Sequence, residues 1–395
     1  MGMQIGIVGK PNVGKTTFFN AATSAHAEMA SYPFTTIDAN RGVMYVRIPC
    51  PCREFNVTCN PHNSECRDGI RYVPIEAIDV AGLVPKAHEG RGLGNKFLDD
   101  LRQASCLIHV VDVSGSTDEE GQMCDVGAHD PEKDVKFLEE EIDYWIQGII
   151  SKDWEAISRR CKLEGKKISK ALAEKLTGLG IKEGDIHAAI RNAGLEEDDA
   201  TKWSDDDLFR LSSHIRKAGK PILLALNKCD KAPDEMVKKM MGEYAIPTSA
   251  EAELALSRAA EHGLISYKPG DSSFTILDKN MDEKHLKALE YIKTHVMEKY
   301  GGTGIQKCID KAVFEMLDLI AVYPVEDEHH LTDKKGNVLP DVFLLPRGST
   351  AVDLAYKVHT DLGEGFIRAI DARTQRIIGA DHELKNGDII RIISK

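Results

Sequence analysis

The stretch GKPNVGKTT at residues 9–17 decides the fold of this 395-residue chain. It fits the pattern Gly-x4-Gly-Lys-Thr, in which glycines let backbone N–H groups turn toward phosphate oxygens and the lysine reaches the outer phosphates. An apolar run at 3–8 predicts a buried strand before the loop, and 16–25 predicts a helix whose positive N-terminal end faces the anion. We therefore expect a nucleotide-phosphate site formed by Gly9, Lys10, Pro11, Asn12, Val13, Gly14, Lys15, Thr16 and Thr17.

Further strands are predicted at 75–79, 106–113, 221–226 and 244–246, and they alternate with helical segments. This alternation is typical of a doubly wound α/β sheet, in which ligands bind beyond the carboxyl ends of the strands. Asp79 and Gly82 follow the strand at 75–79. We expect Asp79 to hold Mg²⁺ together with the Thr16 hydroxyl, and the Gly82 N–H to contact the terminal phosphate.

The segment NKCD at 227–230 follows the strand at 221–226 and predicts the base that is bound. The Asp230 carboxylate can accept hydrogen bonds from N1–H and the exocyclic amine of guanine, a donor pair that adenine lacks. The Lys228 stem is expected to cover the base, and Asn227 to tie its loop to the phosphate loop. Ser249 and Ala250, after the strand at 244–246, would place N–H groups near guanine O6. The predicted ligands are GTP or GDP with Mg²⁺.

The length of the chain argues for two or three domains. Residues 131–217 interrupt the sheet pattern with amphipathic helical segments, and Ser204 followed by Asp207 predicts a capping box. Residues 318–395 carry short β-type runs around one helical segment at 350–360, typical of a small α+β domain. We therefore predict a nucleotide-binding domain formed by 1–130 and, with connecting helices, 218–317, a helical insertion at 131–217, and a C-terminal domain at 318–395.

Charge and hydropathy limit the partners. No stretch reaches 18 uninterrupted apolar residues, and the N-terminus lacks a signal-peptide pattern, so we expect no membrane association and a cytoplasmic location. The net charge of −12 means that RNA contact needs a local basic patch. The insertion holds a basic segment, which is either a solvated helix face or a surface for RNA phosphates. Its members are Arg159, Arg160, Lys162, Lys166, Lys167, Lys170 and Lys175.

Four of the nine cysteines, Cys50, Cys52, Cys59 and Cys66, lie within 17 residues, with His62 among them. Four thiols can form a tetrahedral Zn²⁺ site, but the spacing C-x-C-x6-C-x6-C is not that of a standard zinc finger. Disulfides and free thiols are the alternatives. All three states stay open at the level of sequence.

The motifs, in this order, resemble the Obg family of GTPases and within it the YchF branch. The resemblance rests on GIVGKPNVGKTTFFNA, YPFTTI, DVAGLVPKAHEGRGLGNKFLDDLR, HVVD and NKCD, and on PRGSTAVDLAYKVHTDL and ELKNGDIIRI near the C-terminus, which look like a TGS domain. It implies a P-loop GTPase fold with a helical insertion and a C-terminal ubiquitin-like β-grasp. It also implies a partner in the ribosome, through rRNA or tRNA contacts of the insertion and the TGS domain.

The resemblance further implies catalytic positions. The second threonine of YPFTTI, Thr36, matches the switch threonine that joins Mg²⁺, so the expected catalytic set is Lys15, Thr36 and Gly82, with His88 as a further candidate against the alternative of an exposed loop histidine. Leu83 stands where related GTPases carry a water-positioning glutamine, which predicts slow hydrolysis. Asn12 matches a position that binds an activating K⁺ in related GTPases.

YchF proteins whose base-reading box ends in Glu tend to favour ATP. This chain keeps Asp230, as in the archaeal-type branch, so we expect a slow, translation-associated GTPase switch. The alternatives are an ATP/GTP nucleotidase and a nucleotide-stabilised RNA-binding module that is not linked to the ribosome. The oligomeric state is not predicted.

Overall fold

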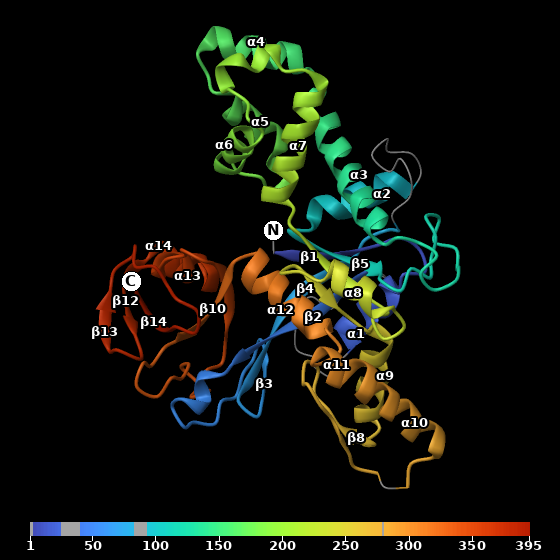
Figure 1. Cartoon of the computed structure of the whole chain (residues 1–395). Helices are drawn as coiled ribbons and strands as arrows, with labels where there is room; N and C mark the ends of the chain where they lie inside the picture. Colours follow the sequence, from blue (N-terminus) through green and yellow to red (C-terminus); the bar gives the residue numbers. More distant parts are fainter. Residues whose placement is uncertain (1–2, 25–39, 83–92, 279) are drawn as a thin grey trace. The chain divides into compact units, whose positions relative to one another are not determined.

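The computed structural model describes residues 3–24, 40–82, 93–278 and 280–395. The chain divides into two compact units (Figure 1). Of the described residues, one unit comprises 3–24, 40–42, 76–82, 93–278 and 280–308, and the other 43–75 and 309–395. The second unit joins 43–75 to the C-terminal residues, a grouping that the sequence did not predict. The four domain ranges derived from sequence stay predictions.

A seven-stranded sheet contains the strands predicted around the phosphate loop. Its order is β2-β4-β1-β5-β6-β7, and β3 pairs with β4. β1 is parallel to β4 and β5, and β6 is parallel to β5 and β7, whereas β3 is antiparallel to β4. The strands are β1 (Gln4–Val8), β2 (Arg41–Pro49), β3 (Glu65–Arg67), β4 (Ile70–Asp79), β5 (Cys106–Asp112), β6 (Ile222–Asn227) and β7 (Ala245–Pro247).

The central strands are apolar throughout because both faces of a parallel sheet are covered. Every residue of β1 and β5 is buried. The register pairs Ile7 with Asp79, and Asp112 with Asn227, so strands that are far apart in sequence end at the same edge. The predicted strands at 3–8, 75–79, 106–113, 221–226 and 244–246 are confirmed, as is the doubly wound α/β sheet.

The helices outside the insertion include α1 and α2, which contact β1, and α1 also packs against α9. A small hairpin of β8 (Ile265–Ser266) and β9 (Thr275–Ile276) lies between α9 and α10 in sequence. Turns of π-helix at Lys293–Met297 and Ala312–Met316 extend the last helices. The helices are α1 (Lys15–Ser24), α2 (Leu93–Gln103), α8 (Asp234–Met240), α9 (Ala250–Glu261), α10 (Glu283–Ile292), α11 (Glu298–Tyr300) and α12 (Ile305–Lys311).

The insertion is helical, as its sequence pattern predicts (Figure 1). The Trp154 and Trp203 rings stack within it with centroids 5.5 Å apart. The capping box is confirmed: the Ser204 hydroxyl accepts from the Asp207 N–H at 3.2 Å, and the Asp207 carboxylate accepts from the Ser204 N–H. The helices are α3 (Glu132–Ser151), α4 (Trp154–Glu164), α5 (Ile168–Leu176), α6 (Glu183–Asn192) and α7 (Asp205–Gly219).

A buried ion pair joins α3 to α7. The Arg216 guanidinium donates to the Asp143 carboxylate at 2.7 Å, and the two side chains are 4 % and 5 % exposed. Glu139, which is 39 % exposed, also accepts from Arg216 at 3.1 Å. Burial raises the pKa of Asp143, and Arg216 opposes this only in part. The pair therefore costs desolvation, and losing one partner leaves the other charge buried without compensation.

The C-terminal residues form a five-stranded sheet of order β11-β10-β14-β12-β13, in which β10 and β14 are parallel and the other neighbours antiparallel. α13 packs against this sheet, which gives the predicted β-grasp (Figure 1). The Thr350 hydroxyl caps α13 and forms a capping box with Asp353. The elements are β10 (Leu319–Val325), β11 (Phe343–Pro346), α13 (Ala351–Val358), α14 (Thr360–Glu364), β12 (Phe366–Asp371), β13 (Arg376–Ile378) and β14 (Ile389–Ser394).

Asp143→Ala should destabilise the insertion by about 3 kcal/mol, because it leaves Arg216 buried with only Glu139 as a partner. The three tryptophans of the chain, Trp145, Trp154 and Trp203, all lie in the insertion, so their fluorescence during urea unfolding reports on this region. The matched control Glu139→Ala should cost less than about 1 kcal/mol, as a partly exposed partner. Equal losses of stability in the two variants would contradict the assignment of Asp143 as the main partner of Arg216.

Candidate nucleotide-binding site

The phosphate loop connects β1 to α1 and requires glycine at two positions. A Cβ on Gly9 would lie 2.6 Å from the Val110 carbonyl oxygen. Gly14 has a φ of +90°, and a Cβ there would lie 2.4 Å from the Asn227 amide nitrogen. Only glycine permits this conformation and these approaches without strain. The loop is thus held tightly between the ends of β5 and β6.

Lys15 and Asp79 form an ion pair at the start of α1. Both side chains are mostly buried, at 14 % and 19 % exposure. Thr16 follows Lys15 in the same turn, and both residues line a cavity beside the phosphate loop. A carboxylate and a hydroxyl beside a phosphate loop are oxygen ligands of the kind that Mg²⁺ prefers, so these residues fit the predicted ion.

Asn227 joins three parts of the site. Its side-chain amide donates to the Val13 carbonyl at 2.9 Å, and its oxygen accepts from the Ala250 N–H at 3.1 Å. Ser249 caps α9, since its hydroxyl accepts from the Ala252 N–H at 3.4 Å. The end of β6, the phosphate loop and the start of α9 are therefore held together by one side chain.

Lys228 has a φ of +61°, and its ammonium contacts the Asp112 carboxylate at 2.8 Å. Asp112 ends β5 and also accepts from the hydroxyls of Ser114, Ser116 and Thr117. Burial alone would raise the pKa of Asp112, but hydrogen bonds from Lys228 and Ser114 outweigh it and hold that pKa below its ordinary value. Sequence reasoning missed Asp112, although its place at a strand end is the signal that identified Asp79.

Asp230 is accompanied by a second residue that the sequence did not indicate. The Tyr291 hydroxyl, from α10, donates to the Asp230 backbone carbonyl at 3.2 Å and lies 3.5 Å from a carboxylate oxygen. The Tyr291 ring stacks on His295 with centroids 4.2 Å apart. Tyr291 thus limits how far the Asp230 loop can move.

A cavity of about 470 Å³ runs between the phosphate loop and the Asp230 loop. This volume falls in the range of about 300–1,000 Å³ that is usual for small-molecule sites. Ser116, Met123, Lys231 and Glu251 also line it. The sequence-predicted residues that the structure brings together there are Lys10, Pro11, Asn12, Gly14, Lys15, Thr16, Thr17, Asn227, Lys228, Asp230 and Ser249.

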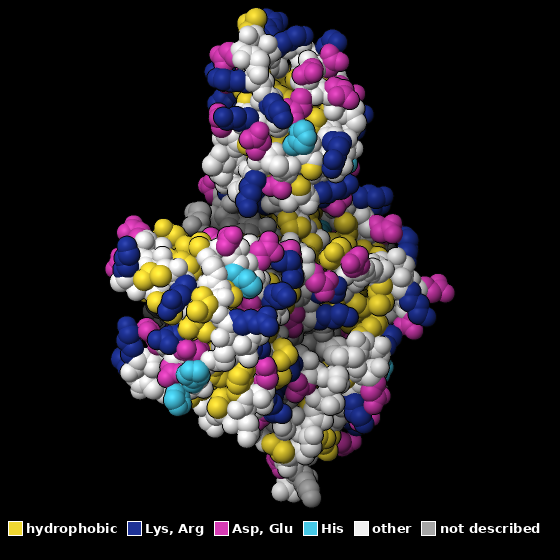
Figure 2. All heavy atoms as spheres, turned by 90° about the vertical axis from the view of Figure 1, so that its left-hand side faces the viewer, with side chains coloured by type: hydrophobic (Ala, Val, Ile, Leu, Met, Phe, Trp, Pro, Cys, Tyr) yellow, Lys and Arg dark blue, Asp and Glu magenta, His cyan; other side chains and the backbone are white. Residues whose placement is uncertain are grey.

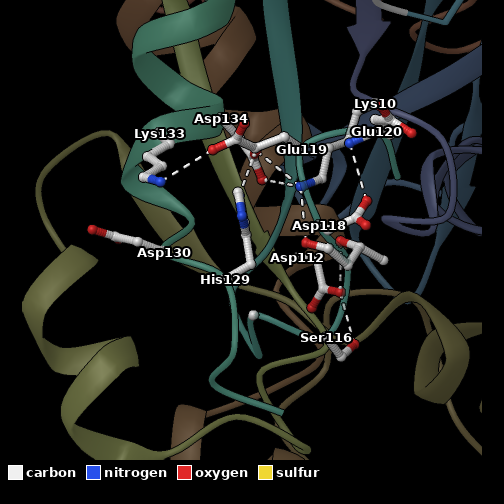
Figure 3. A network of polar contacts seen from close by, with 12 residues as sticks. Lys10, Asp112, Ser116, Asp118, Glu119, Glu120, His129, Asp130, Lys133 and Asp134 are labelled. Atoms are coloured by element: carbon white, nitrogen blue, oxygen red, sulfur yellow. Dashed lines mark hydrogen bonds and ion pairs between the residues drawn. The ribbon is translucent and has the colours of Figure 1, made fainter. Parts of the chain in front are cut away.

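The side chain of Lys10 contacts the start of the insertion (Figure 3). Its ammonium lies 2.7 Å from the Asp134 carboxylate and donates to the Thr117 carbonyl at 3.0 Å. His129 contacts the same carboxylate at 2.8 Å, and all three side chains are buried. The Asn12 amide donates to the Gly121 carbonyl at 2.9 Å. The segment that leads into α3 is therefore anchored to the phosphate loop.

Three sequence-predicted positions, Thr36, Leu83 and His88, lie outside the described residues. Gly82 is half-buried and is the last described residue before 83–92. A Cβ on Gly82 would meet nothing within 4 Å among the described atoms, so its neighbours do not explain the glycine.

The basic segment of the insertion is exposed except for Lys175, which donates to the carbonyls of Ile150 and Lys152 at the end of α3. Acidic side chains neutralise part of it: Lys166 lies 2.7 Å from Glu164, and Arg159 lies 3.4 Å from Glu155. Figure 2 shows Lys and Arg side chains interspersed with Asp and Glu over this region. The segment is therefore a mixed surface with a local excess of positive charge.

The four clustered cysteines belong to the second unit. Their Sγ atoms all lie within 4.8 Å of one another, and none forms a disulfide. His62 is not part of this group of ligand atoms.

Three family models match the chain. Residues 4–140 match a model described as a 50S ribosome-binding GTPase, residues 225–327 match the G4 motif-containing domain of Obg-like GTPases of the YGR210-like type, and residues 329–394 match the TGS domain. Among the described residues, the helices are too short or too polar to cross a membrane.

Relatives extend over nearly the whole chain. An uncharacterised GTP-binding protein of Methanocaldococcus jannaschii is 55 % identical, over 99 % of this chain and 98 % of the relative. Another, from Schizosaccharomyces pombe, is 34 % identical over 98 % and 94 %. Human Obg-like ATPase 1 is 26 % identical over 93 % and 82 %.

Two solved structures have a similar fold. A GTP-binding protein from Pyrococcus horikoshii OT3 superposes with a TM-score of 0.79 at 46 % identity, with complete coverage of both chains. The YchF GTPase of S. pombe gives 0.58 at 19 % identity, covering 99 % of this chain and 98 % of that one, and supports the fold alone. On its motifs, its TGS domain and its full-length relatives, the chain belongs to the YchF-like GTP-binding proteins of the Obg family.

Proposed function

We propose that this protein hydrolyses GTP slowly with the help of Mg²⁺ and acts as a molecular switch whose nucleotide state is read by the ribosome. The observation that carries the proposal is one cavity lined by Lys15 at one end and Asp230 at the other, with Asp79 paired to Lys15 beside it. Asn227 holds the two ends at a fixed separation through Val13. Such an arrangement suits a nucleoside triphosphate with a guanine base.

The chemistry follows from the positions of the charges. When bound, Mg²⁺ neutralises charge on the outer phosphates. Thr16 and Asp79 would hold it, together with Thr36. The Lys15 ammonium stabilises negative charge on the phosphate oxygens, and the Gly82 N–H would contact the terminal phosphate. Because Leu83 cannot orient water, the intrinsic rate is expected to be low, and His88 and a K⁺ ion near Asn12 are candidates to raise it.

The ribosomal partner is supported by the family models and by charge. The matched GTPase model is described as ribosome-binding, and the chain carries a TGS domain. In an acidic chain, the exposed lysines and arginines of the insertion are a candidate contact for RNA phosphates. We propose that these two regions contact rRNA or tRNA in the cytoplasm.

An ATP-directed activity is the second candidate, because full-length relatives are named Obg-like ATPase 1. The residue that favours GTP in this chain is Asp230, which lines the cavity at the base end. A carboxylate there pairs with the two donors of guanine and repels the acceptor N1 of adenine.

Asp230→Asn should weaken GDP binding by about a hundredfold or more, because two hydrogen bonds to a charged acceptor are lost. The same variant should gain affinity for xanthosine diphosphate, because the C2 carbonyl of xanthine can accept a hydrogen bond from the new amide. Competition against a fluorescent guanine nucleotide measures both effects, with Glu251→Gln at the rim of the cavity as the control. ATP binding as tightly as GTP to the unaltered protein would contradict guanine selectivity.

The cation at Asn12 is tested by hydrolysis in KCl and NaCl. We expect K⁺ to accelerate single-turnover GTP hydrolysis by at least about tenfold over Na⁺, since a fixed cation stabilises transition-state charge. Asn12 has a φ of +61°, so Asn12→Gly removes the side chain without backbone strain. The K⁺/Na⁺ rate ratio of this variant should fall to about one, and equal rates in both salts for the unaltered protein would rule out the cation.

The switch is tested by co-sedimentation with ribosomal subunits, with GDP and with a non-hydrolysable GTP analogue. Binding should be stronger with the analogue. The double variant Lys166→Ala/Lys167→Ala should reduce the slope of the logarithm of the binding constant against the logarithm of the salt concentration by about 1.5. Lys284→Ala with Lys287→Ala, on the exposed face of α10, changes the net charge equally and is the control. Identical pelleting in both nucleotide states would refute the switch.

A further inference from the structure

Three short pieces of chain bring the four clustered thiols together. β2 ends at Pro49, and Cys50 and Cys52 occupy the turn that follows, where the Cys50 N–H donates to the Gly69 carbonyl at 2.9 Å. Cys66 lies in β3 and pairs across the ladder with Arg71 of β4. Cys59 lies in the loop between them. A turn, a loop and a strand thus converge on one point.

The separations of the sulfur atoms suit a bound ion. Cys50 Sγ lies 3.8 Å from Cys59 Sγ, and Cys52 Sγ lies 3.8 Å from Cys66 Sγ. Four sulfurs at tetrahedral positions around a zinc ion, with Zn–S bonds of about 2.3 Å, are about 3.8 Å apart. A disulfide would need about 2.05 Å between two of them. All four Sγ atoms lie within 4.8 Å of one another, so the thiols form one group of four and not two separate pairs.

The charge beside the cluster gives an independent indication. Arg71 is fully buried, and its guanidinium donates to Cys50 Sγ at 3.4 Å, to the Leu339 carbonyl at 3.0 Å and to the Ser64 hydroxyl at 3.0 Å. None of the ion pairs within 4.0 Å among the described residues includes Arg71. Its guanidinium carbon lies 5.4 Å from the Tyr323 ring centroid, and its charge only partly offsets the burial that raises the pKa of the Asp341 carboxyl. A buried cation needs a negative partner. Protonated thiols and disulfides carry no charge, whereas four thiolates around one divalent ion form an anion.

We propose that Cys50, Cys52, Cys59 and Cys66 bind one Zn²⁺ ion, and that Arg71 is the counter-ion of this centre. Thiolates are soft ligands that select zinc over Mg²⁺ or Ca²⁺. All four positions are filled by protein atoms, so the site is closed to substrate and its role is structural. Cys50 and Cys52 are buried, while Cys59 and Cys66 are half-buried, which leaves a side for the ion to enter.

The centre fixes a segment that has little core of its own. Between Cys52 and Cys66, the backbone forms a local turn, with the Val57 N–H donating to the Cys52 carbonyl at 2.9 Å. It also bonds to the loop between β10 and β11: the Asn60 N–H donates to the Val338 carbonyl at 3.0 Å, and the His62 N–H to the Pro340 carbonyl at 2.7 Å. Glu54 also pairs with Arg373 at 2.8 Å. Short, loop-rich segments rarely order without a disulfide or a metal. The ion would therefore fix the shape of 50–66, the segment whose separate hydrogen bonds and ion pair contact the C-terminal residues.

The first test is the metal content of the full-length protein, purified without chelator. One equivalent of zinc per chain is expected, together with nine titratable thiols after denaturation in chelator. Replacing zinc by Co²⁺ should give the intense visible absorption of tetrahedral thiolate coordination, a signature that does not depend on any variant folding. Less than about a tenth of an equivalent of metal after reconstitution with zinc overturns the proposal, and the thiol count then identifies two disulfides (five thiols) or free cysteines (nine).

A matched pair of variants then assigns the ligands. Cys59→Ser should lose most of the bound zinc and lower the thermal midpoint by about 5 °C or more, because a metal-bound native state is favoured over the unfolded chain. Cys124→Ser, a half-buried cysteine outside the cluster, should keep one equivalent of zinc. Full zinc retention in Cys59→Ser, or equal loss in both variants, overturns the assignment.

Discussion

The two hydrogen bonds of the Asn227 side chain are the interaction on which the nucleotide site depends. They join the carbonyl of Val13 to the N–H of Ala250, so the phosphate loop and the start of α9 cannot move independently. Gly14 lies so close that a Cβ would reach 2.4 Å from the same amide. Because a buried amide that loses its partners costs about 1–3 kcal/mol per unsatisfied group, this junction is stable only when all its members are present. The distance between the phosphate end and the base end of the cavity is therefore set by the fold.

The Lys10–Asp134–His129 cluster extends the same logic to the insertion. Lys10 belongs to the phosphate loop, whereas Asp134 opens α3, and their buried ion pair spans 124 positions of sequence. A buried ion pair contributes little net stability, but separating its partners is expensive. The start of α3 is thus tied to the phosphate loop. A movement of the phosphate loop must therefore be accompanied by a movement of the start of α3, and the reverse also holds.

Local patterns predicted the parts of the protein that local physics determines. The phosphate loop, the five strands around it and the capping box at Ser204 depend on short-range glycine geometry, apolar periodicity and a three-residue spacing. The Thr350–Asp353 capping box has the same three-residue spacing but was not predicted. The Lys228–Asp112 and Arg216–Asp143 contacts could not be predicted from the sequence. Many charged residues of both signs occur along the chain, and only the packing of β5 with β6 and of α3 with α7 brings these particular pairs together. The grouping of 43–75 with the C-terminal residues likewise depends on backbone pairing between distant segments.

Two lysines that line the cavity are each paired with a carboxylate at the end of a strand, Lys15 with Asp79 and Lys228 with Asp112. A phosphate that approaches Lys15 competes with Asp79 for the same ammonium, and the two anions repel each other. If Asp79 served as a ligand of a divalent cation, its charge would be neutralised and Lys15 would be available to the phosphate. Each ligand then raises the affinity for the other by the same factor, as linkage requires. In the proposed mechanism, coupling between nucleotide and Mg²⁺ would thus follow from one shared carboxylate. Asp112, by contrast, is buried, accepts from three hydroxyls and holds the Lys228 ammonium in this structure.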